Sequence, residues 1–106
     1  MHQVDFDISG QVAVITGAGG VICGVMAREM AKKGAKIALL DLFVESAQQI
    51  ADEINAAGGQ AIAVAANVLD RASLEKARDE VVAAYGHIDI LINGAGGNKK
   101  QATVSP

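Results

Sequence analysis

The chain has 106 residues, of which 51% are hydrophobic and 3% aromatic, and its formal net charge is −3. This length allows one small domain or part of a larger one. The charge and the isolated pairs Lys32-Lys33 and Lys99-Lys100 exclude nucleic acid and membrane surfaces as expected partners. The chain has no apolar run of membrane-spanning length, no secretory signal and one cysteine, so we expect a reduced, cytoplasmic protein.

The segment from Val12 to Gly24 is typical of a strand, a glycine-rich turn and the start of a helix. Residues 12–15 are an unbroken apolar run, as in a strand buried on both faces. Residues 21–33 then change to helical spacing and end at Gly34. The predicted apolar positions of this helix are Ile22, Val25, Met26 and Met30.

The glycine-rich turn would deliver a helix N-terminus to the carboxyl end of a central strand. Unpaired N–H groups and the helix dipole favour a phosphate or pyrophosphate there, and glycines allow it to approach closely. The regular G-x-G-x-x-G pattern is not met, because Ile22 stands where the third glycine should fall. A tight turn without a ligand is the alternative.

The rest of the chain continues the alternation of strands and helices. Apolar strands are predicted at 36–41, 60–65 and 88–92, with helices starting near Val44 and after a capping Asp70. The inner face of the last helix is predicted to hold Leu74, Ala77, Val81 and Tyr85. The pattern β-α-β-α-β-α-β requires parallel strands and right-handed crossovers. We expect an α/β, doubly wound parallel sheet in the order 3-2-1-4, with the glycine turn at the switch point between the first and fourth strands.

Asp41 ends the second predicted strand. In a dinucleotide-binding fold, a carboxylate at this position accepts hydrogen bonds from the adenosine ribose hydroxyls. It would repel a 2′-phosphate, and neither Leu42 nor Phe43 supplies a cation to hold one, so NAD is the expected cofactor. The alternative is that Asp41 caps the following helix.

Two further segments follow predicted strands at the same edge, Asn67-Val68 and Asn93-Gly94-Ala95-Gly96. Ligands of open α/β sheets collect at this edge. Ordinary turns are the alternative, more credible for Asn67 than for the second glycine-rich turn. The predicted cofactor-binding residues are Gly17, Gly19, Gly20, Val21, Ile22, Asp41, Leu42, Asn67, Val68, Asn93, Gly94, Ala95 and Gly96.

Together these segments resemble the short-chain dehydrogenase/reductase family. Thr16-Gly17 with its turn resembles that family's Thr-Gly-x-x-x-Gly-x-Gly. Tyr85-Gly-His-Ile-Asp-Ile-Leu-Ile-Asn-Gly-Ala-Gly96 resembles its Phe-Gly-x-Ile-Asp-x-Leu-Val-Asn-Asn-Ala-Gly. The resemblance covers nearly the whole chain but only the cofactor-binding half of the family's usual length. The departures from the motifs are Val21 and Cys23 for glycines, Asn67 for an aspartate and Gly94 for the second asparagine.

Gly17-Ala-Gly-Gly-Val-Ile-Cys-Gly24 with Asn93-Gly-Ala-Gly-Gly-Asn98 is similar to a subgroup of D-mannonate oxidoreductases or fructuronate reductases. The resemblance implies a Rossmann-type domain over residues 1–106, the N-terminal NAD-binding part of a longer enzyme. It further implies hydride transfer between nicotinamide and a small alcohol or carbonyl substrate, with a sugar acid such as fructuronate or mannonate as one candidate. A homo-oligomer is expected.

The family's catalytic Tyr-x-x-x-Lys and serine are not found in this sequence. Tyr85 has no lysine at that spacing and is expected in the core, while His2 and His87 are expected to be isolated. We therefore assign no catalytic or metal-binding residue and expect the chain alone to be inactive. Cys23 is expected to be a packing residue; a nucleophile with a pKa lowered by the helix N-terminus is the alternative.

Two other functions compete with the oxidoreductase. A non-catalytic NAD-binding or regulatory module fits the missing catalytic residues, whereas Thr16-Gly17 and the turn after Asn93 disfavour a methyltransferase.

The apolar fourth strand would be an exposed edge if the chain ended near Pro106. We therefore expect it to be covered by further chain or by a second copy.

Overall fold

The computed structural model describes residues 7–94. Its elements alternate as predicted: β1 (Val12–Thr16), α1 (Val21–Lys32), β2 (Lys36–Asp41), α2 (Val44–Ala56), β3 (Gln60–Ala65), α3 (Arg71–Tyr85) and β4 (Ile90–Asn93). The strands form one sheet in the order β3-β2-β1-β4, and every pairing is parallel. The predicted fold class and strand order are therefore confirmed.

Helix ends lie where the local chemistry predicts. The Asp70 carboxylate accepts a hydrogen bond from Ala72 N at 3.0 Å and caps the N-terminus of α3. Gly86 ends that helix in the left-handed region at φ +92°, a conformation that costs other residues free energy. These local signals explain why the boundaries agree with the sequence analysis.

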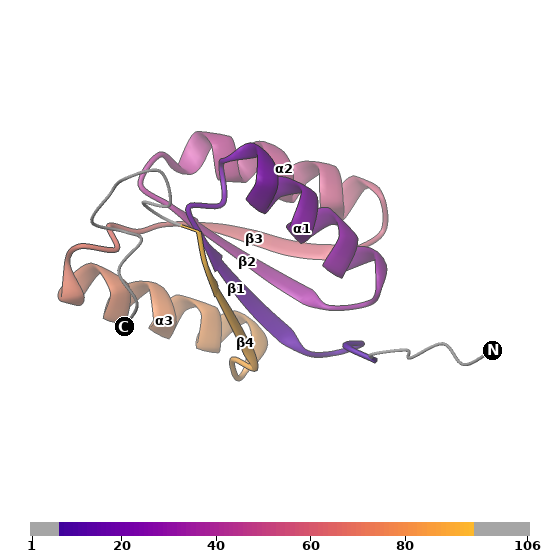
Figure 1. The fold of residues 1–106 in the computed structure, drawn as a ribbon. Coiled ribbons are helices and arrows are strands. Elements are labelled where there is room, and N and C mark those ends of the chain that lie inside the picture. The colour runs from indigo at the N-terminus through magenta and orange to yellow at the C-terminus, as the bar shows by residue number, and fades with distance from the viewer. Residues whose placement is uncertain (1–6, 95–106) are drawn as a thin grey trace.

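The helices cover both faces of the sheet (Figure 1). On one face, Ala13 and Ile15 of β1 belong to the same buried cluster as residues of α1 and α2. On the other face, Val12 and Val14 pack in a second cluster with Ala77 and Val81 of α3. Because alternate residues of β1 enter different clusters, the whole strand is buried, as its unbroken apolar run predicts.

The predicted inner face of α1 is wrong. The residues that α1 buries are Cys23, Gly24, Ala27 and Ala31. Ile22 and Val25 are 75% and 52% exposed, and Met26 and Met30 are only half-buried. Small side chains let the helix lie close to both the sheet and α2, so close packing outweighs the hydrophobicity of the larger residues.

The fourth strand is shorter and more exposed than predicted. It begins at Ile90 rather than Ile88, and along it half-buried residues alternate with exposed ones. Leu91 is 68% exposed on the face that carries α3. The expected burial on both faces is therefore not observed. Among the described residues β4 also has a neighbouring strand on one side only, β1. None of the helices in residues 7–94 is long and apolar enough to cross a membrane.

Candidate cofactor-binding site

The carboxyl ends of the four strands gather the predicted polar residues at one edge of the sheet. Thr16 ends β1 beside Asn93 of β4, and the Thr16 hydroxyl donates a hydrogen bond to Asn93 Oδ1 at 2.8 Å. The backbone N–H of Gly94 donates to the Thr16 carbonyl at 3.1 Å. The ends of β1 and β4 are therefore held together by both side-chain and backbone bonds.

The glycine-rich turn leaves β1 and crosses toward the end of β2. Gly17 has φ +66°, so the turn needs a glycine at that position, and Ala18 N donates to the Leu40 carbonyl at 3.2 Å. Val21 is the first residue of α1 and is 84% exposed. No residue of 7–94 other than glycine has a positive φ. Valine is therefore accommodated where the family motif has a glycine.

The N-terminus of α1 presents backbone donors that are unpaired within residues 7–94. Gly20 is the N-cap and provides no side-chain cap, and Gly24 N donates to the Gly20 carbonyl at 2.9 Å as the first helical bond. The N–H groups of Val21, Ile22 and Cys23 therefore have no acceptor within the helix. Such a group of donors at the positive end of a helix dipole suits a pyrophosphate.

Asp41 connects this turn to the second strand. Its Oδ2 accepts a hydrogen bond from Gly19 N at 2.7 Å, and its Oδ1 accepts one from Phe43 N at 2.8 Å. The N-cap residue of α2 is Phe43, and Asp41 bonds only its N–H, while no side chain of the described residues bonds the first N–H groups of the helix itself. Asp41 is therefore not a side-chain N-cap of α2. A carboxylate has about four acceptor positions, and two backbone bonds leave room for ribose hydroxyls.

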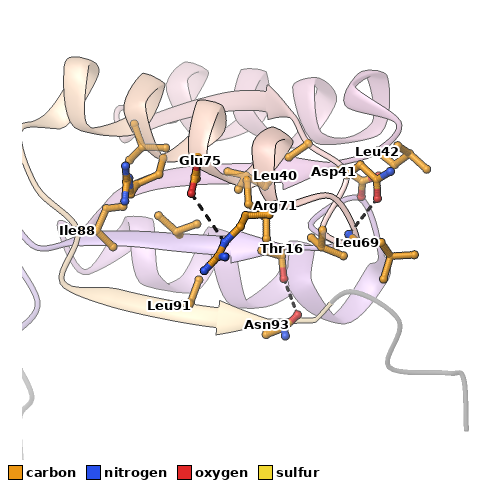
Figure 2. A pocket seen from close by; sticks show the side chains of 18 of the residues that line it. Thr16, Leu40, Asp41, Leu42, Leu69, Arg71, Glu75, Ile88, Leu91 and Asn93 are labelled. Carbon is orange, nitrogen blue, oxygen red and sulfur yellow. Dashed lines mark hydrogen bonds and ion pairs between the residues drawn. The ribbon is translucent and has the colours of Figure 1, made fainter. Parts of the chain in front are cut away.

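A cavity of about 1230 Å³ opens beside these strand ends, between the sheet and α3 (Figure 2). Six of the predicted residues line it: Gly17, Asp41, Leu42, Asn67, Val68 and Asn93. The predicted Gly19, Gly20, Val21, Ile22 and Gly94 do not line it. Ala95 and Gly96 lie outside the described residues.

The cavity also has a wall that the sequence analysis missed. Arg71, Leu74, Glu75 and Arg78 of α3 line it, together with Phe43, Leu69, Ile88 and Leu91. Figure 2 shows Arg71 and Glu75 facing each other, with Arg71 Nε and Glu75 Oε2 3.8 Å apart. The spacing of four residues along a helix was a signal for this ion pair.

Asn67 shapes the turn after β3. Its Oδ1 accepts a hydrogen bond from Leu69 N at 3.0 Å, and its own N–H donates to the Ser73 hydroxyl at 2.9 Å. These bonds form an Asx-type turn that holds Asn67 and Val68 at the cavity. The side-chain amide NH₂ group is the part of Asn67 left to meet a ligand.

Two residues considered for chemistry lie away from this edge. The Tyr85 hydroxyl donates to the Ile37 carbonyl at 3.2 Å, near the start of β2, and burial raises the pKa of Tyr85. His87 is not isolated as expected, since its Nε2 lies 2.8 Å from Asp89 Oδ2. That same oxygen accepts a bond from Val12 N at the start of β1. Both side chains therefore support the amino ends of the strands.

Tyr85→Phe is expected to lower stability by about 1 kcal/mol, because it removes one half-buried hydrogen bond. Turnover by the intact protein is expected to be unchanged. Thermal unfolding and steady-state kinetics test the two parts, with wild type as the reference. A loss of kcat in a fully folded Tyr85→Phe variant would contradict this assignment.

Cys23 lies buried behind the glycine turn, and its pKa is raised, first by burial and then by the charge of Asp41. The raised pKa argues against the activated-nucleophile alternative, because the reactive form of a cysteine is its thiolate. The sulfur lies 3.8 Å from the Thr16 carbonyl. Cys23 is thus held as a neutral thiol in a packed position.

Cys23→Ala is expected to leave turnover of the intact protein nearly unchanged and to cost about 1 kcal/mol of stability through a small cavity. The raised pKa also predicts a pH effect. The stabilisation is fully present below the ordinary thiol pKa of 9.0 and is lost as the pH rises above it. Between neutral and alkaline pH, the free energy of unfolding measured with denaturant should fall less for Cys23→Ala than for wild type. An equal fall in both proteins would contradict the prediction.

Gly19→Ala is expected to distort the turn, although φ at Gly19 is not positive. An added Cβ would lie 2.7 Å from Ser46 Cβ and 2.9 Å from Asp41 Oδ2. We expect a loss of about 1–3 kcal/mol of stability. Gly20→Ala is the matched control, because its Cβ would meet only Gly17 O at 3.5 Å. The control should lose less than about 1 kcal/mol. Equal losses in denaturant unfolding would show that space at Gly19 is not limiting.

The family model for short chain dehydrogenases matches residues 11–105. The chain belongs to the short-chain dehydrogenase family. The match includes the glycine-rich turn and the segment around β4, so the resemblance inferred from these two motifs is confirmed.

Relatives within the short-chain dehydrogenase family include named oxidoreductases. The chain is 52% identical over 96 residues to the uncharacterized oxidoreductase UxuB of Bacillus subtilis, covering 91% of this chain and 34% of that protein. It is 43% identical over 96 residues to the D-threitol dehydrogenase of Mycolicibacterium smegmatis, covering 89% of this chain and 37% of that one.

The fold also matches a solved family member with its cofactor. A Haemophilus influenzae protein provisionally named a D-mannonate oxidoreductase, solved with bound NAD, superposes with a TM-score of 0.84 at 44% identity. The superposition covers 94% of this chain and 36% of that protein. The chain therefore spans about a third of the length of each of these three proteins.

Proposed function

We propose that residues 1–106 are the N-terminal, NAD-binding part of a longer oxidoreductase. The intact protein would transfer hydride between nicotinamide and an alcohol or carbonyl substrate. The observation that carries this proposal lies at the carboxyl edge of the sheet, where the Asp41 carboxylate accepts a bond from Gly19 N in the glycine turn. This turn leads directly into the N-terminus of α1, whose first three N–H groups have no acceptor within the helix. Bound nicotinamide would supply the hydride donor or acceptor.

The donor and acceptor groups fit NAD along its length. The N–H groups of Val21, Ile22 and Cys23 would bind the pyrophosphate. Asp41 would accept bonds from the adenosine ribose, with Leu42 beside it, and Asn67 and Val68 would border the adenine side. Asn93, held by Thr16, and the residues after it would line the nicotinamide side.

NAD rather than NADP is supported by the charges near Asp41. A 2′-phosphate would approach that carboxylate and form a like-charge contact, which costs several kcal/mol. Leu42 and Phe43, which follow Asp41, are 60% and 67% exposed and carry no charge. Two arginines line the same cavity, and each already lies near a carboxylate: Arg71 is 3.8 Å from Glu75, and Arg78 is 3.3 Å from Asp79.

A sugar acid or polyol is the substrate class that we propose. The support comes from the relatives, since one is named for D-mannonate and another for D-threitol. The turn sequence around Cys23 and Gly94 also has the form seen in the mannonate and fructuronate subgroup. Substrate contacts would come from parts of the intact protein beyond the described residues.

A non-catalytic NAD-binding module is the second candidate. It is favoured by one observation: no tyrosine, lysine or histidine of residues 7–94 lines the cavity at the carboxyl edge of the sheet. Tyr85 and His87 support the other end of the sheet. The reading frame beyond the codon for Pro106 separates the candidates. A continuing frame with Tyr-x-x-x-Lys supports the enzyme, and its absence supports the module.

NAD binding is tested by titrating NAD⁺ into the intact protein and measuring heat of binding, with AMP as the competing fragment. We expect saturable binding that AMP weakens, since AMP carries the ribose and adenine that Asp41 and Asn67 would meet. Oxidation of sugar acids and polyols with NAD⁺ is then assayed by NADH formation. The absence of saturable NAD⁺ binding by a folded protein would overturn the proposal.

A further inference from the structure

Two departures from the family motif meet in space. Cys23 stands at a motif glycine in the first turn of α1, and Gly94 stands at a motif asparagine just after β4. A Cβ added at Gly94 would overlap the sulfur of Cys23 and would lie 3.0 Å from the Thr16 carbonyl oxygen. Residues far apart in the sequence therefore compete for one small space.

The Thr16 carbonyl is the shared partner of both residues. It accepts the Gly94 N–H at 3.1 Å, and the Cys23 thiol lies 3.8 Å from it. Gly94 has no positive φ, so its backbone conformation does not itself demand glycine. Apart from the chain neighbours of Gly94, only Cys23 and Thr16 among the described residues have atoms within 4 Å of the added Cβ. The requirement for glycine thus comes from the space that these two residues occupy.

We propose that Cys23 and Gly94 are a coupled pair in which the thiol occupies the space of a side chain at position 94. Gly94 is then a positioning residue, because its missing side chain lets the end of β4 lie against the first turn of α1. That turn and Asn93 are two walls of the proposed NAD site, so this inference rests on the proposed function. Adding a side chain at position 94 while Cys23 is kept should move the walls apart.

The test is a double-substitution cycle in the intact protein, using Gly94→Ala, Cys23→Gly and both together. Gly94→Ala is expected to lower Tm by about 5 °C through overpacking. It is also expected to raise the Kd for NAD⁺ about tenfold, whereas a merely structural role would change Tm alone. In the Cys23→Gly background, Gly94→Ala should change Tm and the Kd for NAD⁺ by less than half as much as it does in wild type. The reference for the double variant is Cys23→Gly alone.

The matched control replaces Ala27, a buried residue of the same helix that has no atom within 4 Å of the added Cβ. Ala27→Gly combined with Gly94→Ala should show no recovery of Tm or of NAD⁺ binding.

If Gly94→Ala does not fold, recovery of a folded protein by Cys23→Gly supports the coupling, and continued failure to fold overturns it. Additive effects on Tm would also overturn it. If wild type does not bind NAD⁺, the proposed function fails, while the Tm cycle still decides whether the pair is coupled.

Discussion

Replacing Asp41 with alanine is expected to weaken NAD⁺ binding by the intact protein about 100-fold. The carboxylate would bond two ribose hydroxyls, and hydrogen bonds to a charged group contribute about 1.5–3 kcal/mol each. The same change should favour NADP⁺ relative to NAD⁺. We expect wild type to bind NAD⁺ about 1000-fold more tightly than NADP⁺, because the like-charge contact costs several kcal/mol. In Asp41→Ala, the preference for NAD⁺ over NADP⁺ is expected to fall below about tenfold.

Asp41→Ala also removes two backbone bonds, so folding and recognition must be measured separately. The carboxylate holds Gly19 N and Phe43 N in the free protein. Thermal unfolding without cofactor reports the loss of these bonds, and calorimetry with each cofactor reports recognition. Asp52→Ala is the control, since it removes an exposed carboxylate of α2 that bonds only Gln48 among the described residues. Equal or tighter binding of NADP⁺ by wild type would contradict the assignment of Asp41.

The 106-residue chain, purified by itself, is expected to show no detectable NAD-linked oxidation of sugar acids or simple alcohols. Binding a cofactor does not by itself stabilise a transition state, and a positioned acid or base contributes about 10²–10⁴-fold to the rate. Among residues 7–94, the groups at the cofactor edge are already engaged: Thr16 bonds Asn93, and Asp41 bonds the glycine turn. Tyr85 is held at the opposite end of the strands.

The mass of the same chain in solution tests the structural half of this prediction. Leu91 in β4 and Ile88 just before it are 68% and 37% exposed, and β4 has an open edge within the described residues. Open strand edges with apolar side chains promote self-association. Light scattering is therefore expected to show species larger than a monomer. A monomeric chain that turns over substrate would contradict both halves.

Much of the architecture follows from local chemistry in the sequence. The change from an apolar run at Val12 to helical spacing after Val21 marks β1 and α1, and Asp70 and Gly86 mark the ends of α3. Parallel strands joined by helices then leave few arrangements, so the order β3-β2-β1-β4 was predictable. The position of Asp41 at the cofactor edge follows from the same rules.

The buried face of α1 could not be predicted from periodicity. Both the apolar stripe containing Ile22 and Val25 and the small-residue stripe containing Cys23 and Ala27 have helical spacing. The distance between α1, the sheet and α2 decided between them, and only the small side chains fit that distance. A hydrophobic pattern carries no information on this distance.

The sequence by itself determined the order of the elements, the glycine turn and the strand ends where Asp41 and Asn93 lie. The reason is that φ preferences and caps act over a few residues, and each crossover joins strands that follow one another in the chain. Tertiary structure alone decided that Asp41 bonds Gly19, that α3 walls the cavity, and that Cys23 occupies the space beside Gly94. These contacts join residues distant in the chain. They depend on atom-to-atom distances that are set only when the sheet and helices pack together.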